Sequence, residues 1–149
     1  MILADVNALV YAFHPQTPLH ALARSAMTAY RDRGELVVLT DVAASFVRIV
    51  THDRINRAPD SFGGAMEFIH ALTADSRFLR EARISRWNVF RELGDRIDIS
   101  GLLVPDALLA ATGIDFGASL LTADRDFLRF PGLRVHLMTS AGIIDHTVM

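Results

Sequence analysis

The stretch that decides the fold is the first one, Met1-Ile2-Leu3-Ala4-Asp5-Val6-Asn7-Ala8-Leu9. A short apolar run ends in a carboxylate at Asp5, and the amphipathic segment 8–13 follows directly. This order predicts a strand over residues 2–5 and a helix over residues 7–13, with an acid at the junction. In open α/β sheets, ligands bind beyond the carboxyl ends of the strands, so Asp5 is expected at a binding site.

Strand and helix patterns alternate along the rest of the chain. Because strands that alternate with helices form parallel sheets, we predict an α/β fold with a mainly parallel central sheet and helices on both faces. The segment 78–84 fits either a short strand or a turn of helix. Further strands are expected over 35–40, 118–122 and 133–138. Further helices are expected over 19–33, over 41–50 with Thr40 or Asp41 as cap, over 61–72, over 86–93, and from Val104 to an end bracketed by Gly113 and Gly117.

The composition fits one domain spanning residues 1–149. Hydrophobic residues make up 51% of the chain and charged residues 21%, which is enough for a packed core. Cysteine is absent, so disulfides and thiolate metal sites are excluded. No apolar run approaches the roughly 18 residues of a membrane span, and the N-terminus lacks a basic start and a cleavage site. We therefore expect a soluble cytoplasmic protein that has no membrane partner.

All fifteen basic residues are arginine, and the net charge of -2 gives no overall attraction to nucleic acid. The absence of lysine excludes a P-loop. It also weighs against phosphate-receiver domains and aspartyl phosphatases, which usually neutralise the phosphoryl group with a lysine. In the arginine-rich segment, Arg77, Arg80 and Arg83 share a face if they are helical. That face would either follow an RNA backbone or be solvated.

Three carboxylates occupy comparable places in the predicted fold. Asp5 ends the first strand, Asp106 lies at a helix start, and Asp124 follows the strand over 118–122. Because parallel strands bring these ends to one edge of the sheet, the carboxylates are expected to converge. Converging carboxylates repel one another unless a cation is present, and oxygen ligands without Cys or His suit Mg²⁺ or Mn²⁺. The site therefore predicts metal-assisted hydrolysis of a phosphodiester.

Each acid also has a purely local interpretation. Asp106 could cap its helix, and Asp124 and Asp126 could be ordinary turn residues. Asp5 is harder to explain in this way, because an uncompensated charge at a buried strand end is costly. A general α/β phosphohydrolase acting on a small molecule also fits these acids.

Four motifs occur in order along nearly the whole chain. They are Asp5–Phe13, Phe46–His52, Leu103–Ala107, and Thr122–Phe127 followed by Phe130–Leu133. Together they resemble a PIN-domain ribonuclease toxin of the VapC family. The resemblance implies a PIN-like three-layer sandwich and the toxic component of a type II toxin–antitoxin system. It also implies a Mg²⁺-dependent endoribonuclease with RNA as substrate, a VapB-type antitoxin as partner, and a homodimer.

The resemblance assigns roles to individual residues. Asp5 and Asp106 match the family's metal-binding acids, and Asp124 matches a further active-site acid that also faces the metal. Asn7 matches a small polar residue that orients Asp5. Thr122 matches the hydroxyl residue that precedes the last acid.

The chain departs from the family pattern at one place, because the segment 40–48 lacks the glutamate that PIN domains usually carry there. Asp41 is the only carboxylate in that segment, and it either replaces the glutamate or only caps the helix. In the expected mechanism, Asp5 and Asp106 hold the metal. Asp124, alone or together with Asp41, positions or deprotonates the attacking water. Without Asp41, we expect weaker metal affinity. The missing glutamate leaves open a catalytically degenerate PIN module that binds RNA or antitoxin without cleavage.

Overall fold

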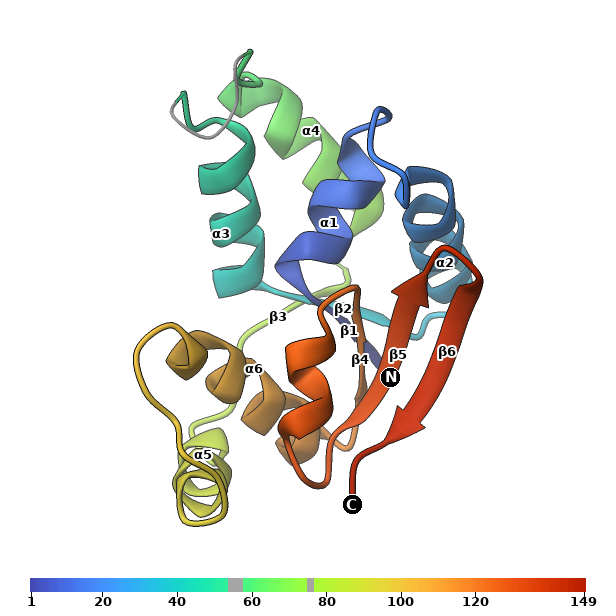
Figure 1. Ribbon diagram of the computed structural model, residues 1–149. Helices are drawn as coiled ribbons and strands as arrows, with labels where there is room; N and C mark the ends of the chain where they lie inside the picture. The colour runs from blue at the N-terminus through green and yellow to red at the C-terminus, as the bar shows by residue number, and fades with distance from the viewer. Residues whose placement is uncertain (54–57, 75–76) are drawn as a thin grey trace.

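The computed structural model describes residues 1–53, 58–74 and 77–149. In these residues, six strands form one sheet with the order β3-β2-β1-β4-β5-β6 (Figure 1). The strands are β1 Ile2–Ala4, β2 Leu36–Leu39, β3 Leu79–Arg80, β4 Ser119–Thr122, β5 Arg134–Thr139 and β6 Gly142–Thr147. The helices are α1 Val6–Phe13, α2 His20–Asp32, α3 Thr40–Val50, α4 Phe62–Leu72, α5 Arg86–Gly94 and α6 Leu103–Phe116, followed by the 3-10 helix η1 Arg125–Arg129.

The centre of the sheet is parallel and fully buried. Every residue of β1, β2 and β4 is buried, and β1 pairs in parallel with both β2 and β4. Strands that are covered on both faces appear in a sequence as continuous apolar runs, which is why these segments could be predicted. The predicted mainly parallel sheet is confirmed.

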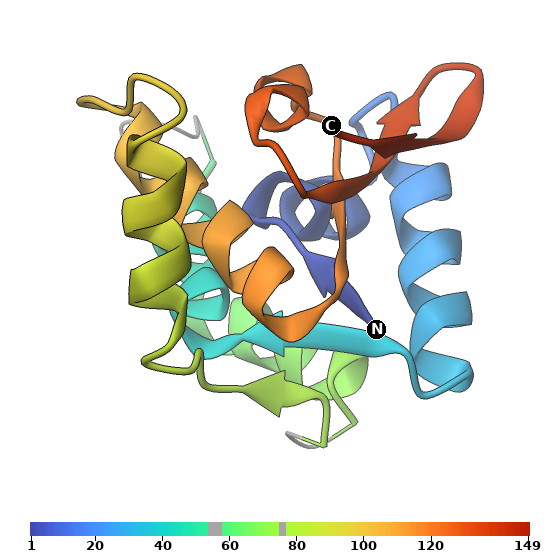
Figure 2. The same ribbon diagram turned by 90° about the horizontal axis from the view of Figure 1, so that it is seen from below.

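Helices cover both faces of this sheet, as Figures 1 and 2 show together. Helices α1, α3 and α4 lie on one face, with α2 packed against α1, and helices α5 and α6 lie on the other. The chain changes faces between β3 and β4, so the strand order reverses between the neighbours β1 and β4. Ligands of open α/β sheets bind at such a switch point, and Asp5 and Asp124 follow the two strands that form it. The predicted three-layer arrangement is therefore confirmed.

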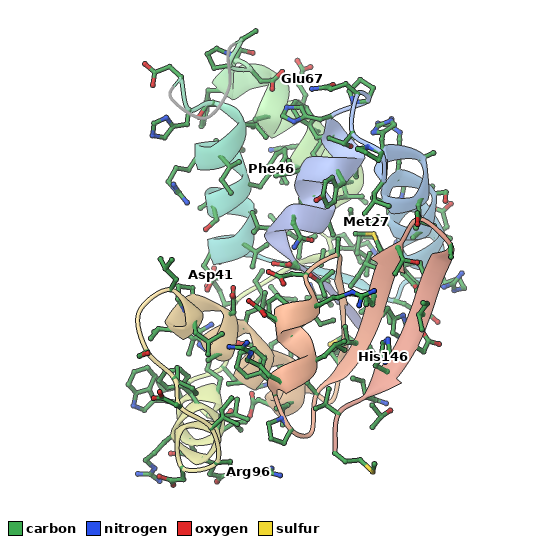
Figure 3. All side chains as sticks on the ribbon, in the orientation of Figure 1. Met27, Asp41, Phe46, Glu67, Arg96 and His146 are labelled. Atoms are coloured by element: carbon green, nitrogen blue, oxygen red, sulfur yellow. The ribbon has the colours of Figure 1, made fainter. Side chains whose placement is uncertain are left out.

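Aromatic side chains join the helices of the first face. Phe46 of α3 is fully buried and meets Phe13 of α1 edge-on, with ring centroids 5.3 Å apart (Figure 3). Phe68 of α4 packs against Phe46 with a centroid separation of 5.2 Å. These contacts fix α3 relative to α1, and thereby the first turn of α3 relative to the end of β1. In the described part of the chain, no helix combines the length and apolarity that crossing a membrane requires.

The sheet differs from the sequence prediction at its two edges. The undecided segment 78–84 contains the two-residue strand β3. Strand β6 was not predicted, and it pairs antiparallel with β5 at the other edge. It is only partly buried, so its sequence lacks the continuous apolar run that marks a central strand.

The end of one helix agrees with the prediction, and the cap of another does not. Helix α6 ends at Phe116, between Gly113 and Gly117 as predicted. A side chain at Gly113 would lie 2.9 Å from Leu133 Cδ1, so glycine allows the helix to pack closely there. Gly117 then ends the helix in a left-handed conformation with φ of 62°. The prediction that Thr40 or Asp41 caps α3 is wrong, because the cap position is Leu39 and no side chain caps this helix. The sequence also predicts a polar, mostly basic loop over 52–59, and residues 54–57 of it lie outside the described residues.

Candidate active site

Asp5 lies at the junction of β1 and α1, where the first motif predicted it. Its side chain is buried, and its residue is 3% exposed. The carboxylate Oδ1 accepts a hydrogen bond of 2.6 Å from the Val6 backbone N–H and so caps α1. The other oxygen, Oδ2, accepts a bond of 2.7 Å from the Thr122 hydroxyl. Asp5 therefore combines a capping role with a fixed position at the switch point.

Thr122 and Asn7 form a hydrogen-bond chain that ends at Asp5. Asn7 Oδ1 accepts from the Ala123 backbone N–H at 3.1 Å, which fixes the orientation of the amide. Its Nδ2 donates to Thr122 Oγ1 at 3.2 Å, and the Asp124 backbone N–H donates to the same oxygen at 3.0 Å. Because Thr122 Oγ1 accepts twice, its own hydrogen is directed to Asp5. Asn7 thus orients Asp5 through Thr122 rather than by direct contact.

Burial raises the pKa of Asp5 from 3.8 to about 6. The hydrogen bonds from Thr122 and from the Val6 backbone oppose this rise, and the negative charges of Asp106 and Asp124 add to it. The carboxylates thus come close enough to repel one another, although Asp106 and Asp124 lie on different elements. The charges of the three acids therefore act on one another, as the predicted convergence requires.

Asp106 projects from the first turn of α6 and does not cap it. The cap position is Leu102, and no side chain makes a capping hydrogen bond there. Burial raises the pKa of Asp106, and the charges of Asp124 and Asp126 raise it further, while Arg129 lowers it. The local interpretation of Asp106 as a helix cap is therefore wrong.

The structure is compatible with both interpretations of Asp124, as a turn residue and as an active-site acid. Its Oδ1 accepts from the Asp126 backbone N–H at 2.8 Å and caps η1, as a turn residue would. Its charge also raises the pKa of both Asp5 and Asp106. Asp126 is exposed and pairs with Arg129 at 3.3 Å, at the rim of this group of acids.

An open cleft of about 180 Å³ lies between the start of α3 and the helices α5 and α6. Asp41 lies at the end of α3 that is nearest to α6 (Figure 3). Ser45 follows it one turn later on the same wall. The cleft is lined by Asp5, Val6, Leu39, Asp41, Val42, Ser45, Arg86, Pro105, Asp106, Leu108 and Leu109. The structure thus brings Asp41 into one cleft with Asp5 and Asp106, in the segment where the family glutamate is missing.

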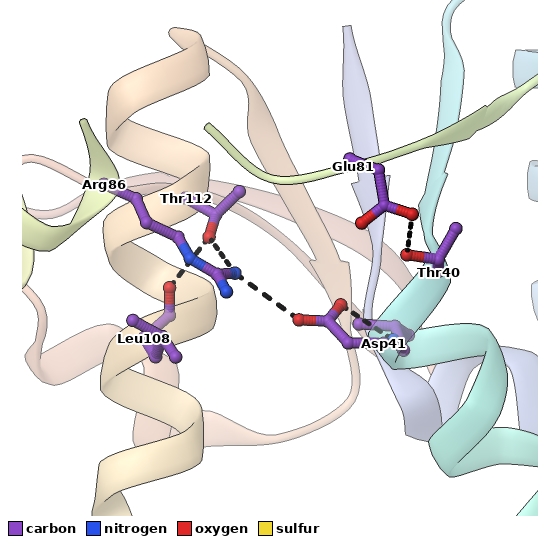
Figure 4. A network of polar contacts seen from close by, with 7 residues as sticks. Thr40, Asp41, Glu81, Arg86, Leu108 and Thr112 are labelled. Atoms are coloured by element: carbon purple, nitrogen blue, oxygen red, sulfur yellow. Dashed lines mark hydrogen bonds and ion pairs between the residues drawn. The ribbon is translucent and has the colours of Figure 1, made fainter. Parts of the chain in front are cut away.

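Arg86 enters this cleft from α5, and no feature of the sequence distinguishes it from the other arginines. Its Nη1 lies 3.4 Å from Asp41 Oδ2 and 3.4 Å from Thr112 Oγ1 (Figure 4). Nearby, the Thr40 hydroxyl donates to Glu81 at 2.7 Å. Only the return of the chain from β3 to β4 carries α5 to this position, so no local pattern could have identified Arg86.

The condition for an arginine face over residues 77–83, a helix, is not met. These residues do not form a helix, and Arg80 lies in strand β3. Arg77 lies over the Phe78 ring at 5.4 Å, and Arg83 lies over the Phe116 ring at 4.7 Å. The three side chains therefore do not form one helical surface for an RNA backbone.

The donor atoms of the site suit a hard divalent cation, because they are carboxylate oxygens whose charges repel one another. In the described residues, no three Asp, Glu, His or Cys side chains are grouped closely enough to hold a metal ion by themselves. Mg²⁺ in proteins is commonly held by one or two carboxylates together with water and substrate phosphates. The residues present fit that kind of site, and they do not form a cage made only of protein atoms.

Known proteins match this chain over most of its length. A family model described as the PIN domain matches residues 2–133. VapC ribonuclease Mb2897 of Mycobacterium bovis is 37% identical over 136 residues, which cover 90% of this chain and 92% of that protein. Ribonuclease VapC25 of Mycobacterium tuberculosis is 35% identical over 138 residues, which cover 90% of this chain and 96% of that protein.

A solved structure shares the fold. It is the crystal structure of VapBC2 from Rickettsia felis bound to a DNA fragment from their promoter, and it matches with a TM-score of 0.67. The match covers 91% of this chain and 97% of the other at 18% sequence identity, so it supports the fold alone. Family model, relatives and fold agree, and the chain belongs to the PIN-domain family of VapC ribonucleases.

Proposed function

We propose that this chain is the toxin of a type II toxin–antitoxin system and an endoribonuclease that hydrolyses RNA phosphodiester bonds with the help of Mg²⁺. The observation that carries the proposal is the convergence of Asp5, Asp106 and Asp124 at the switch point of the sheet, where their charges act on one another. Relatives that match over most of the chain are named ribonucleases, which supports the reaction.

Asp5 and Asp106 are the proposed ligands of Mg²⁺, with Asp124 beside them, and Mn²⁺ is a chemically suitable substitute. A bound divalent ion would activate water and neutralise charge that develops on the phosphate. Burial and mutual repulsion raise the pKa of Asp5 and Asp106, and binding such an ion would offset both. Because no closed set of protein ligands is present in the described residues, we expect modest affinity and a contribution from the RNA phosphate.

The remaining side chains hold and prepare this site. Thr122 and Asn7 keep Asp5 in one orientation, since Thr122 donates to Asp5 Oδ2 at 2.7 Å. Asp124 is proposed to position the attacking water or accept its proton, because its carboxylate is half-buried and adjoins the other acids. Asp41 lines the same cleft and is the candidate replacement for the missing glutamate.

The proposed partners are RNA, a VapB-type antitoxin and a second copy of this chain. The related fold was solved as a complex named VapBC2, which supports an antitoxin partner. We expect a homodimer, which sedimentation of the purified chain would test.

RNA cleavage by the purified, antitoxin-free protein tests the proposal. We expect cutting with Mg²⁺ or Mn²⁺, no cutting with EDTA, and loss of cutting in Asp5→Asn and Asp106→Asn. The control is Asp98→Asn, which removes an exposed carboxylate outside the cleft. Full activity in either active-site variant would overturn the assigned roles. Specific RNA binding by the wild-type chain without any cleavage would favour the non-cleaving module instead.

A further inference from the structure

The cleft beside the acids has an unbalanced charge. Asp5, Asp41 and Asp106 line it, and the other lining residues are uncharged except for Arg86. Among the described residues that line the cleft, Arg86 is therefore the only basic one. An RNA phosphate that enters such a cleft meets several negative charges and, among the described residues that line it, one positive charge. The position of Arg86 is thus central to how a polyanion can approach.

Arg86 is held against the wall of the cleft by a buried neighbour. Thr112 is fully buried, and its hydroxyl donates to the Leu108 carbonyl at 2.9 Å. The oxygen of that hydroxyl is consequently free to accept from Arg86 Nη1 at 3.4 Å (Figure 4). The Arg86 side chain is 24% exposed, so its stem is packed while the guanidinium reaches the opening.

Most of the hydrogen-bonding capacity of this guanidinium is unused. Both of its bonds involve Nη1, one to Asp41 and one to Thr112. In the described part of the chain, Nε and Nη2 of Arg86 have no hydrogen-bond partner. An arginine with a free edge can bind two oxygens of one phosphate at once.

The contact between Arg86 and Asp41 is weak enough to be exchanged. The distance of 3.4 Å from Nη1 to Oδ2 is longer than the 2.7–2.9 Å that is typical of charge-assisted bonds. The Asp41 side chain is 57% exposed, so water screens the pair. Asp41 Oδ1 also accepts from the Val42 backbone N–H at 2.9 Å, which keeps Asp41 in place without Arg86.

We propose that Arg86 binds a phosphate of the RNA in this cleft and leaves Asp41 when the RNA enters. The inference rests on the proposed ribonuclease function, since it names a binding residue for the same site. Release by Arg86 leaves the Asp41 carboxylate beside Asp5 and Asp106 without a positive partner. By binding the phosphate, Arg86 therefore also frees Asp41, the candidate replacement for the missing glutamate.

The test measures RNA binding without cleavage in the full chain carrying Asp5→Asn. Adding Arg86→Gln should weaken binding of a short single-stranded RNA by about tenfold or more, the loss expected for a charge-assisted bond. It should also reduce the slope of log affinity against log salt by about 0.7, the value for one phosphate contact on a single strand. Arg86→Lys keeps the charge without the planar edge and should give an intermediate loss.

Two matched variants separate phosphate binding from a merely structural clamp. Arg91→Gln removes an exposed arginine from the same helix outside the cleft, so it should leave the salt slope unchanged. Asp41→Asn breaks the ion pair but keeps Arg86, so RNA binding should stay equal or become tighter. A clamp predicts the opposite, with Asp41→Asn and Arg86→Gln weakening binding alike. That result, or equal binding by Arg86→Gln and Arg91→Gln, would overturn the inference.

Cleavage by the chain with Asp5 intact separates this inference from the proposed function. Metal-dependent cutting by the wild type, together with unchanged KM in Arg86→Gln, would refute the role of Arg86 alone. A raised KM in Arg86→Gln would support it. Should the wild type bind RNA without cutting, the ribonuclease proposal fails, while the binding comparison still decides whether Arg86 holds the phosphate. If Arg86→Gln does not fold, as judged by its melting curve, the comparison of Arg86→Lys with Arg91→Lys replaces it.

Discussion

Removing the charge of Asp5 should stabilise the metal-free protein at neutral pH while it abolishes activity. In the folded chain, burial raises the pKa of Asp5 from 3.8 to about 6. The folded state therefore holds a proton on Asp5 more tightly than the unfolded state does. Ionising Asp5 costs stability as the pH rises from about 4 to about 6, and the full cost is present above that window.

The size of the effect follows from the pKa difference. Two pKa units correspond to about 3 kcal/mol at pH 7.5, since each unit is worth 1.36 kcal/mol. Less than about 1 kcal/mol of this cost remains near pH 4, where the unfolded side chain is half ionised. The advantage of Asp5→Asn over wild type should therefore grow by about 2 kcal/mol between these two pH values. For a chain of this length, that is a relative rise in Tm of about 4–8 °C.

Urea unfolding in EDTA at several pH values from about 4 to about 7.5 measures this difference. Asp98→Asn is the control, and its stability relative to wild type should vary much less with pH, because Asp98 is exposed. Because Asn cannot reproduce both hydrogen bonds of the carboxylate, the absolute difference is less informative than its change with pH. If the difference between Asp5→Asn and wild type stays constant over the whole range, the burial argument for Asp5 is wrong.

Two further predictions concern the same site. Mg²⁺ at millimolar concentration should raise the Tm of the wild type at neutral pH but not that of Asp5→Asn, and equal shifts in a melting scan would place the ion elsewhere. Thr122→Val should lower the free energy of unfolding by about 2 kcal/mol, because Thr122 is buried and Asp5, Asn7 and the Asp124 backbone N–H all lose a partner. The same variant should raise the pKa of Asp5 further, which the pH dependence of urea unfolding would detect, and an unchanged profile would contradict the hydrogen-bond chain.

The acids of the site show which active-site residues a local sequence pattern can identify. Asp5 could be predicted because a buried apolar run ends at it, and a strand end next to a helix start is a local feature. Asp106 and Asp124 could be selected as candidate active-site acids. Their sequence context could not distinguish that role from a helix cap or a turn residue, because all three have the same local pattern. The structure adds position, because Asp106 makes no cap, while Asp124 caps η1 and its charge acts on Asp5 and Asp106.

The sequence by itself determined the central strands, the order of the helices and the acid at the first strand end. Strands buried on both faces appear as continuous apolar runs, and helices appear as apolar residues at helical spacing, so both can be recognised from neighbouring residues. Only the tertiary structure decided what shares the cleft. Arg86 lies 45 positions from Asp41 along the chain, yet their side chains meet at 3.4 Å. Strand β6 likewise depends on pairing with β5. Its residues are only partly buried, so they do not form the continuous apolar run that would identify a strand in the sequence. Contacts across the switch point depend on how the chain returns from β3 to β4, and no local sequence pattern encodes that path.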